Sequence, residues 1–133
     1  MINKTLLFFA AALLCLTACT NRVNPKALYG DWKYIKIDHP QGDGLTDTIS
    51  TDTLMAKAPF ITFSKNNELK ITWGGKILSQ GKFTISGDNI NFTENLAGGQ
   101  TRTFPFYVSK LDEKSIVFET LGKDGSRVTA IKK

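Results

Sequence analysis

Cysteine and histidine carry the most versatile side-chain chemistry in proteins, and this chain has few of either. Cys15 and Cys19 lie four positions apart in the stretch LLCLTACTNR, and His39 is the single histidine. Two thiols at this spacing are compatible with half of a disulfide framework, a metal clip or a reactive thiol pair. Which chemistry applies depends on the segment that carries them.

Both cysteines lie in an N-terminal segment with the layout of a secretory signal peptide. Lys4 precedes an apolar run from Leu6 to Leu16, and small residues follow. The run is shorter than the roughly 20 apolar residues that a transmembrane helix needs. The layout therefore predicts an export signal and not a membrane span or a buried helix.

The residues after the apolar run indicate the kind of signal. Leu16-Thr17-Ala18-Cys19 resembles the lipobox of bacterial lipoproteins, which has a branched apolar residue at −3 and a small one at −1. Cys15 does not match, because a leucine precedes it. The resemblance implies a signal peptide over residues 1–18 and a lipid thioether on Cys19. It usually implies a further acyl chain, such as palmitate, on the new amine.

Cleavage before Cys19 has two consequences. It removes Cys15 and leaves 115 of the 133 residues, so the mature chain has no free thiol for a disulfide, a thiolate metal site or a nucleophile. Several acyl chains also hold a protein to a bilayer almost permanently, without spanning it. The sequence thus predicts a lipid bilayer as the first partner, bound through acylated Cys19.

Length and charge constrain the rest of the chain. Residues 19–26 are expected to form a short tether, in which Pro25 to Leu28 can begin one helical turn, and residues 27–133 are expected to form one domain. Without Lys4, 16 basic residues face 12 acidic ones, and the lysines are scattered along the chain. This scatter is typical of solvated strand faces. Because the leader predicts export, we do not expect nucleic acid as a partner. The positive charge is better explained by a nearby anionic membrane surface or by simple solubility.

From Trp32 onward, large apolar residues recur at every second position, which is typical of β-strands. Short turns rich in glycine, asparagine and aspartate separate the strands. We expect an all-β fold in which seven clear strands form an antiparallel up-and-down meander that closes into a barrel. Residues 38–58 either add a strand around Leu45 to Leu54, giving eight, or form a mobile flap at the barrel mouth.

The stretch Leu28-Tyr29-Gly30-Asp31-Trp32 resembles the opening motif of lipocalins and of lipocalin-like domains in small bacterial lipoproteins. The later stretches ITFSKNNELKITW, GKFTISGDNINFT and YVSKLDEKSIVFE look like the successive hairpins of that group. The resemblance implies a lipocalin-like barrel of about eight strands in which Gly30 and Trp32 are structural. It also implies that an arginine of the last strand, here Arg127, packs over the Trp32 ring as a cation–π contact.

Aromatic side chains are expected to face the barrel interior. A barrel of eight strands is just wide enough to be filled by side chains or to hold one small ligand. Phe92, Phe104 and Phe118 are further inward candidates, and Gly81 indicates either spare room or a bend of the barrel wall. Close packing, the default of protein interiors, favours a filled core. The alternative is a ligand pocket lined by Trp32, Tyr34, Phe63, Trp73, Phe83 and Phe106.

No residue pattern indicates catalysis, a metal or a cofactor. His39 precedes Pro40, and the mature chain offers no second histidine and no free thiol for a metal site. The aspartates of the neighbouring polar segment lack calcium-loop spacing, namely Asp38, Asp43, Asp47 and Asp52. No motif joins a nucleophile to a base. We therefore expect a protein that is not an enzyme and that needs no cofactor or metal.

Together these observations predict a lipid-anchored barrel in a Gram-negative envelope, on the outer membrane and facing the periplasm. The first functional hypothesis is that a small apolar or amphipathic ligand enters the barrel mouth. The alternative is a filled barrel that serves as an interaction, accessory or inhibitory module of an envelope complex. That alternative predicts an exposed apolar patch, for which Leu78, Val117 and Leu121 are candidates.

Overall fold

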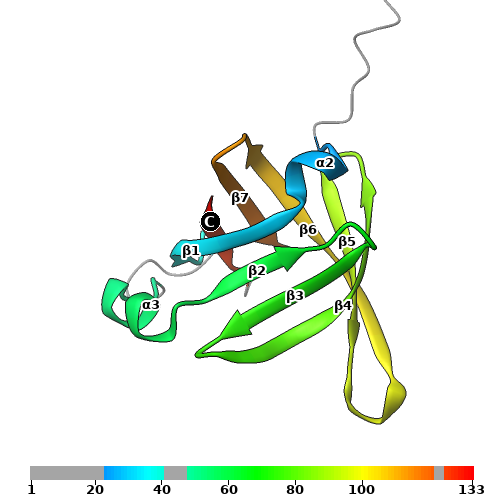
Figure 1. The fold of residues 1–133 in the computed structure, drawn as a ribbon, viewed down its shortest axis with the longest axis horizontal. Coiled ribbons are helices and arrows are strands. Elements are labelled where there is room, and N and C mark those ends of the chain that lie inside the picture. The colour runs from blue at the N-terminus through cyan, green and yellow to red at the C-terminus, as the bar shows by residue number, and fades with distance from the viewer. Residues whose placement is uncertain (1–22, 41–47, 122–124) are drawn as a thin grey trace, which may run out of the picture.

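The computed structural model describes residues 23–40, 48–121 and 125–133, and these form a closed barrel of eight antiparallel strands (Figure 1). The elements follow in the order α2 (Pro25–Leu28), β1 (Gly30–Asp38), α3 (Thr51–Lys57), β2 (Phe60–Phe63), β3 (Glu68–Trp73), β4 (Lys76–Ser86), β5 (Asn89–Asn95), η2 (Ala97–Gly99), β6 (Thr101–Leu111), β7 (Ser115–Thr120) and β8 (Arg127–Lys132). Each strand pairs with the next one along the chain, and β8 pairs with β1. The predicted fold class is therefore confirmed.

The eight strands form without residues 48–54, so the alternative of an extra strand around Leu45 to Leu54 is wrong for the part of that range that the structure describes. Residues 45–47 lie outside the described part of the chain, and Thr51–Lys57 forms helix α3. The Ser50 hydroxyl caps this helix by accepting a hydrogen bond from the Thr53 amide at 3.2 Å. Leu54 is the one buried residue of the helix. Local capping and one apolar anchor thus outweigh the strand preference of the threonines.

The two ends of the barrel differ in what covers them. At one end, which we call the closed end, α2 lies beside the β2–β3 turn, where Pro25 and Asn67 line one shallow groove. At the other end, the open end, α3 contacts the β3–β4 turn through a hydrogen bond from the Gly74 amide to the Lys57 carbonyl. Figure 1 shows α2 and α3 at these separate positions, and it shows the β5–β6 hairpin extending away from the barrel body.

One hydrophobic core fills the barrel, and alternate residues of all eight strands contribute to it, as do Leu28 of α2 and Leu54 of α3. Val23 is only 1% exposed and belongs to the same core. The folded domain therefore includes residues 23–26, which the sequence assigned to the tether. The segment that precedes Val23, with Cys19 in it, lies outside the described residues.

Candidate functional site

The interior of the barrel is the first candidate site, because the sequence left open either a filled core or a ligand pocket there. Five of the six expected pocket residues are buried, and Trp73 is partly buried against the same core; the five are Trp32, Tyr34, Phe63, Phe83 and Phe106. Burial raises the pKa of the Tyr34 phenol well above its ordinary value, because the charged form would lose its hydration. The phenol therefore stays neutral at any physiological pH.

The buried rings contact one another and leave little space between them. Phe106 lies 5.2 Å from Phe118 and 5.8 Å from Phe92, measured between ring centroids. Phe63 meets Phe83 edge to face at 5.4 Å. Such distances are those of rings in direct packing contact. The inward aromatic residues thus form a packed core, and they do not line a common open pocket.

Trp32 closes one end of this core through contacts on both its ring nitrogen and its ring face. Its Nε1 donates a hydrogen bond to the Leu28 carbonyl at 2.7 Å. The ammonium of Lys132 lies 4.5 Å from the Trp32 ring centroid and also donates to the Tyr29 carbonyl. Gly30, with φ of 123°, lies so close to this lysine that a Cβ there would approach its Cε to 3.0 Å. These contacts join α2, β1 and β8 at the closed end.

The cation over Trp32 is therefore a lysine, and the prediction that Arg127 packs on the ring is wrong. Arg127 begins β8 at the open end, whereas Lys132 ends it and pairs directly with Trp32. Val128 and Ala130 point inward, so the two-residue period of a strand places Lys132 on the Trp32 side and Arg127 on the outer side. The alternation in the last strand is the sequence signal that favours Lys132 over Arg127, and the prediction did not use it.

At the open end, Arg127 joins β8 to β1 and β7. Its Nη2 and Nε contact the two carboxylate oxygens of Asp38 at 2.5 and 3.1 Å, and its Nη1 lies 3.9 Å from Glu119. Hydrogen bonds from Arg127 lower the pKa of Asp38 below its ordinary value. His39 lies nearby, with its Nε2 3.2 Å from the Ser126 hydroxyl. The geometry is that of a surface ion pair that joins strands.

The barrel wall bends at Gly81, in the middle of β4. A Cβ at this position would overlap the carbonyl oxygen of Thr93 on β5, so the two backbones approach more closely than any side chain allows. Gly81 and Glu94 form the last pair between β4 and β5. From this pair onward, the β3–β4 and β5–β6 hairpins separate. Gly81 therefore marks a bend and not spare room inside the barrel.

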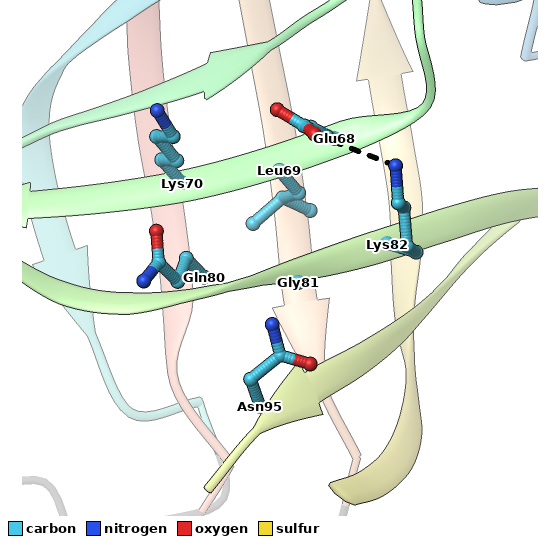
Figure 2. Close-up of a pocket in the computed structure, with 7 residues that line it drawn as sticks. All are labelled: Glu68, Leu69, Lys70, Gln80, Gly81, Lys82 and Asn95. Carbon is cyan, nitrogen blue, oxygen red and sulfur yellow. Dashed lines mark hydrogen bonds and ion pairs between the residues drawn. The ribbon is translucent and has the colours of Figure 1, made fainter. Parts of the chain in front are cut away.

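A polar cleft of about 270 Å³ lies beside this bend. Figure 2 shows side chains of β3 and β4, and Asn95 of β5, around Gly81. At the border of the cleft, the Lys82 ammonium lies 3.4 Å from the Glu68 carboxylate. The cleft is open and shallow. No sequence pattern indicated it, because it arises where two hairpins of the folded barrel separate.

Large apolar side chains are exposed around the open end. Leu78 of β4 and Leu121, which follows β7, are 67% and 64% exposed. Val117, the third residue expected in an apolar patch, is partly buried instead. Leu121 also lines a groove of about 360 Å³ with Phe104 and Pro105 of β6. Next to this groove, β6 extends past the last β7 pairing at Phe106, so among the described residues its first part pairs with β5 alone.

The comparisons with known proteins add no functional assignment to this geometry. No protein-family model matches the chain, and a search of curated proteins finds no match. Among the described residues, no helix has both the length and the apolar character needed to cross a membrane. No group of three or more histidine, cysteine, aspartate or glutamate side chains in the same described ranges is arranged to hold a metal ion.

Proposed function

We propose that this chain is a lipid-anchored lipoprotein of the bacterial envelope whose lipocalin-like barrel works as a protein-interaction module. The observation that carries the proposal is the filled interior. The rings expected to line a ligand pocket pack against one another, as the 5.2 Å contact of Phe106 with Phe118 illustrates. A barrel whose described aromatic side chains pack against one another in this way has its outer surface and its rim left for recognition.

The anchor part of the proposal rests on the N-terminal sequence. The lipobox-like residues Leu16 to Cys19 follow a short apolar leader, and a thioether-linked lipid with a further acyl chain would hold the domain at a membrane. The outer membrane, facing the periplasm, is the proposed location. We expect the intact mass of the purified protein to equal residues 19–133 plus the lipid, and Cys19→Ser to leave an unmodified precursor.

The open end is the proposed contact surface. Leu78 and Leu121 expose apolar side chains there, and large apolar patches rimmed by polar residues are typical of protein contact sites. Among the described residues, the first part of β6 pairs with β5 alone, so its other edge adds backbone donors and acceptors to the same end. An extended segment of a partner can pair with such an edge while its side chains enter the groove beside Leu121.

Cross-linking in native membranes, followed by identification of the attached proteins, tests this contact surface. Photo-reactive residues placed at Leu78 and Leu121 are expected to capture the same partner. The same residue placed at Ile131, an exposed apolar position near the closed end, serves as the matched control. Equal capture from all three positions, or none from the open end, would contradict the proposal.

A small apolar ligand is the second candidate, and the placement of α3 favours it. This helix lies at the barrel mouth and contributes only Leu54 to the core, and the groove between α3 and β1 measures about 150 Å³. Ligand pockets are usually 300 Å³ or larger, so α3 would have to move outward for a ligand to enter. Extraction of the native protein followed by lipid mass spectrometry tests this: a stoichiometric co-purifying ligand would favour the carrier over the interaction module.

A further inference from the structure

The register of five strands aligns a row of outward side chains on one side of the barrel. Lys33 of β1 pairs across with Ile131 of β8 and with Phe60 of β2. Phe60 pairs with Thr72 of β3, which pairs with Ile77 of β4. Their chain neighbours in β1, β2 and β8 point into the core, so strand alternation turns this row to the outside. Figure 1 shows β1, β2 and β3 lying side by side here.

Helix α3 extends this surface beyond β1. Met55 of α3 lines one groove together with Lys33 and Ile35. Met55 is 73% exposed and Ile77 is 54% exposed. We call the whole surface the side face; its members are Lys33, Ile35, Lys36, Met55, Lys57, Phe60, Ile77, Ile131 and Lys133.

The lysines of the side face take part in none of the ion pairs found among the described residues. Those pairs involve Lys82, Arg102, Lys110 and Arg127 instead. On the side face, the ammonium of Lys133 lies over the Phe60 ring at 4.1 Å. The acidic residues of these elements are few.

Three carboxylates belong to the elements of the side face, and one of them, Asp38 at the end of β1, is paired with Arg127. Asp31 of β1 accepts a hydrogen bond from the Thr62 hydroxyl at 2.7 Å, and Asp52 lies in the first turn of α3. Four exposed lysines, Lys33, Lys36, Lys57 and Lys133, outnumber them. The side face therefore combines exposed apolar side chains with an excess of positive charge.

We propose that the side face docks onto a lipid bilayer that carries anionic headgroups, so that the barrel lies on its side against the membrane. The proposal rests on the membrane anchor proposed above. Lysine ammonium groups near a bilayer are attracted to anionic lipids, and the attraction fades within about a Debye length. Apolar side chains such as Met55 and Ile77 can enter the headgroup region, while lysine stems lie along it.

The short connection to Cys19 keeps this surface within reach of the membrane. Val23 is buried at the start of the described chain, and only four peptide steps separate it from Cys19. At about 3.4 Å per residue, these steps span at most ~14 Å. A barrel held this closely contacts the bilayer with some part of its surface, and the side face has the complementary charge.

Vesicle sedimentation of the unlipidated barrel tests the proposal. Residues 23–133 suffice for this, because they hold all eight strands and the core. We expect these residues to bind vesicles of phosphatidylglycerol and phosphatidylcholine, and to bind pure phosphatidylcholine much more weakly. Replacing Lys33, Lys36 and Lys133 with glutamine should weaken binding at least about tenfold, since each lysine near an anionic surface contributes. Met55→Ser should weaken binding without changing the charge.

The matched control removes three positive charges as well, but at the closed end. Lys65, Lys110 and Lys114 are exposed in or near the turns of that end, and their replacement with glutamine should leave vesicle binding within about twofold of the wild type. Equal losses in the two triple variants would indicate a closed-end orientation or a general charge effect, and would overturn the proposal. Absence of preference for phosphatidylglycerol would also overturn it.

The vesicle experiment and the test of the anchor can fail independently of each other. The vesicle experiment uses a barrel without Cys19, whereas the anchor is tested by the intact mass of the full protein. An unlipidated Cys19 with preserved vesicle binding would contradict the proposed anchor alone. A lipidated Cys19 with no vesicle binding by the barrel would contradict the side-face proposal alone. Far-ultraviolet circular dichroism and thermal melting establish that each variant is folded.

Discussion

Side chains at the closed end of the barrel pack and bond to one another, whereas those at the open end are exposed or paired at the surface. At the closed end, Trp32 is fully buried, donates to Leu28 and lies beneath Lys132. At the open end, Leu121 is 64% exposed, and Arg127 pairs with Asp38 near solvent. Because burial and bonding concentrate at the closed end, we expect stability to depend on that end and recognition to depend on the open end.

The strongest test of this comparison is removal of the closed-end tryptophan. Trp32→Ala should lower the free energy of unfolding by about 3–5 kcal/mol, because it removes a buried aromatic ring and leaves a cavity. Urea denaturation followed by circular dichroism measures the change. A loss smaller than about 1 kcal/mol would show that the closed end is not the stabilising region.

The bend at Gly81 should be the next most sensitive position. Gly81→Ala places a Cβ against the Thr93 carbonyl, where the neighbouring backbone must shift. We expect a loss of about 1–3 kcal/mol, as in other overpacked sites. Gly87→Ala provides the control, since a Cβ there meets no atom within 4 Å, although its φ of 61° adds some strain. A Gly81→Ala variant as stable as the wild type would contradict the close approach of β4 and β5.

The two cations of β8 provide a direct comparison of the two ends. Lys132→Gln removes the cation over Trp32 and should lower the free energy of unfolding by about 0.5–2 kcal/mol. In a Trp73→Phe background, Trp32 is the remaining tryptophan, and its fluorescence should change on Lys132→Gln. Arg127→Gln should leave that fluorescence unchanged. A fluorescence change on Arg127→Gln and none on Lys132→Gln would show instead that Arg127 is the cation on the ring.

A smaller, pH-dependent effect is expected from the ion pair at the open end. The pKa of Asp38 is lowered in the folded protein, chiefly by hydrogen bonding to Arg127. Its stabilising contribution is therefore complete above the ordinary carboxyl pKa and is lost as the pH falls through the lowered value. Urea midpoints should fall less between pH ~7 and ~3 in Asp38→Asn than in the wild type. Glu113→Gln, in the exposed β6–β7 turn, is the control.

The smallest effect on stability is expected at the exposed rim. Leu78→Ser and Leu121→Ser should each change the free energy of unfolding by less than about 0.5 kcal/mol, as is usual for exposed positions. The same variants should weaken cross-linking to the proposed partner. A large loss of stability would mean that these leucines serve packing, and the distinction between the two ends would fail.

Much of the barrel was predictable because a strand buries one face and exposes the other. The two-residue period from Trp32 onward indicated strands, and the glycine and asparagine turns indicated an antiparallel meander. Helix α3 was missed because its threonines favour strands, while the signals that decided it are a single Ser50 cap and one buried leucine, Leu54. Local preferences of similar size compete over such a short segment, and packing against β1 decides between them.

The sequence by itself determined the alternation of inward and outward residues, the turns and the lipobox-like leader, because each depends on near neighbours in the chain. Tertiary structure decided which cation reaches Trp32, whether Gly81 marks space or a bend, and how far the aromatic rings fill the interior. Each of these depends on the register between strands, and register fixes distances between residues remote in sequence. Lys132 and Trp32, separated by 100 positions, become neighbours only when β8 closes against β1.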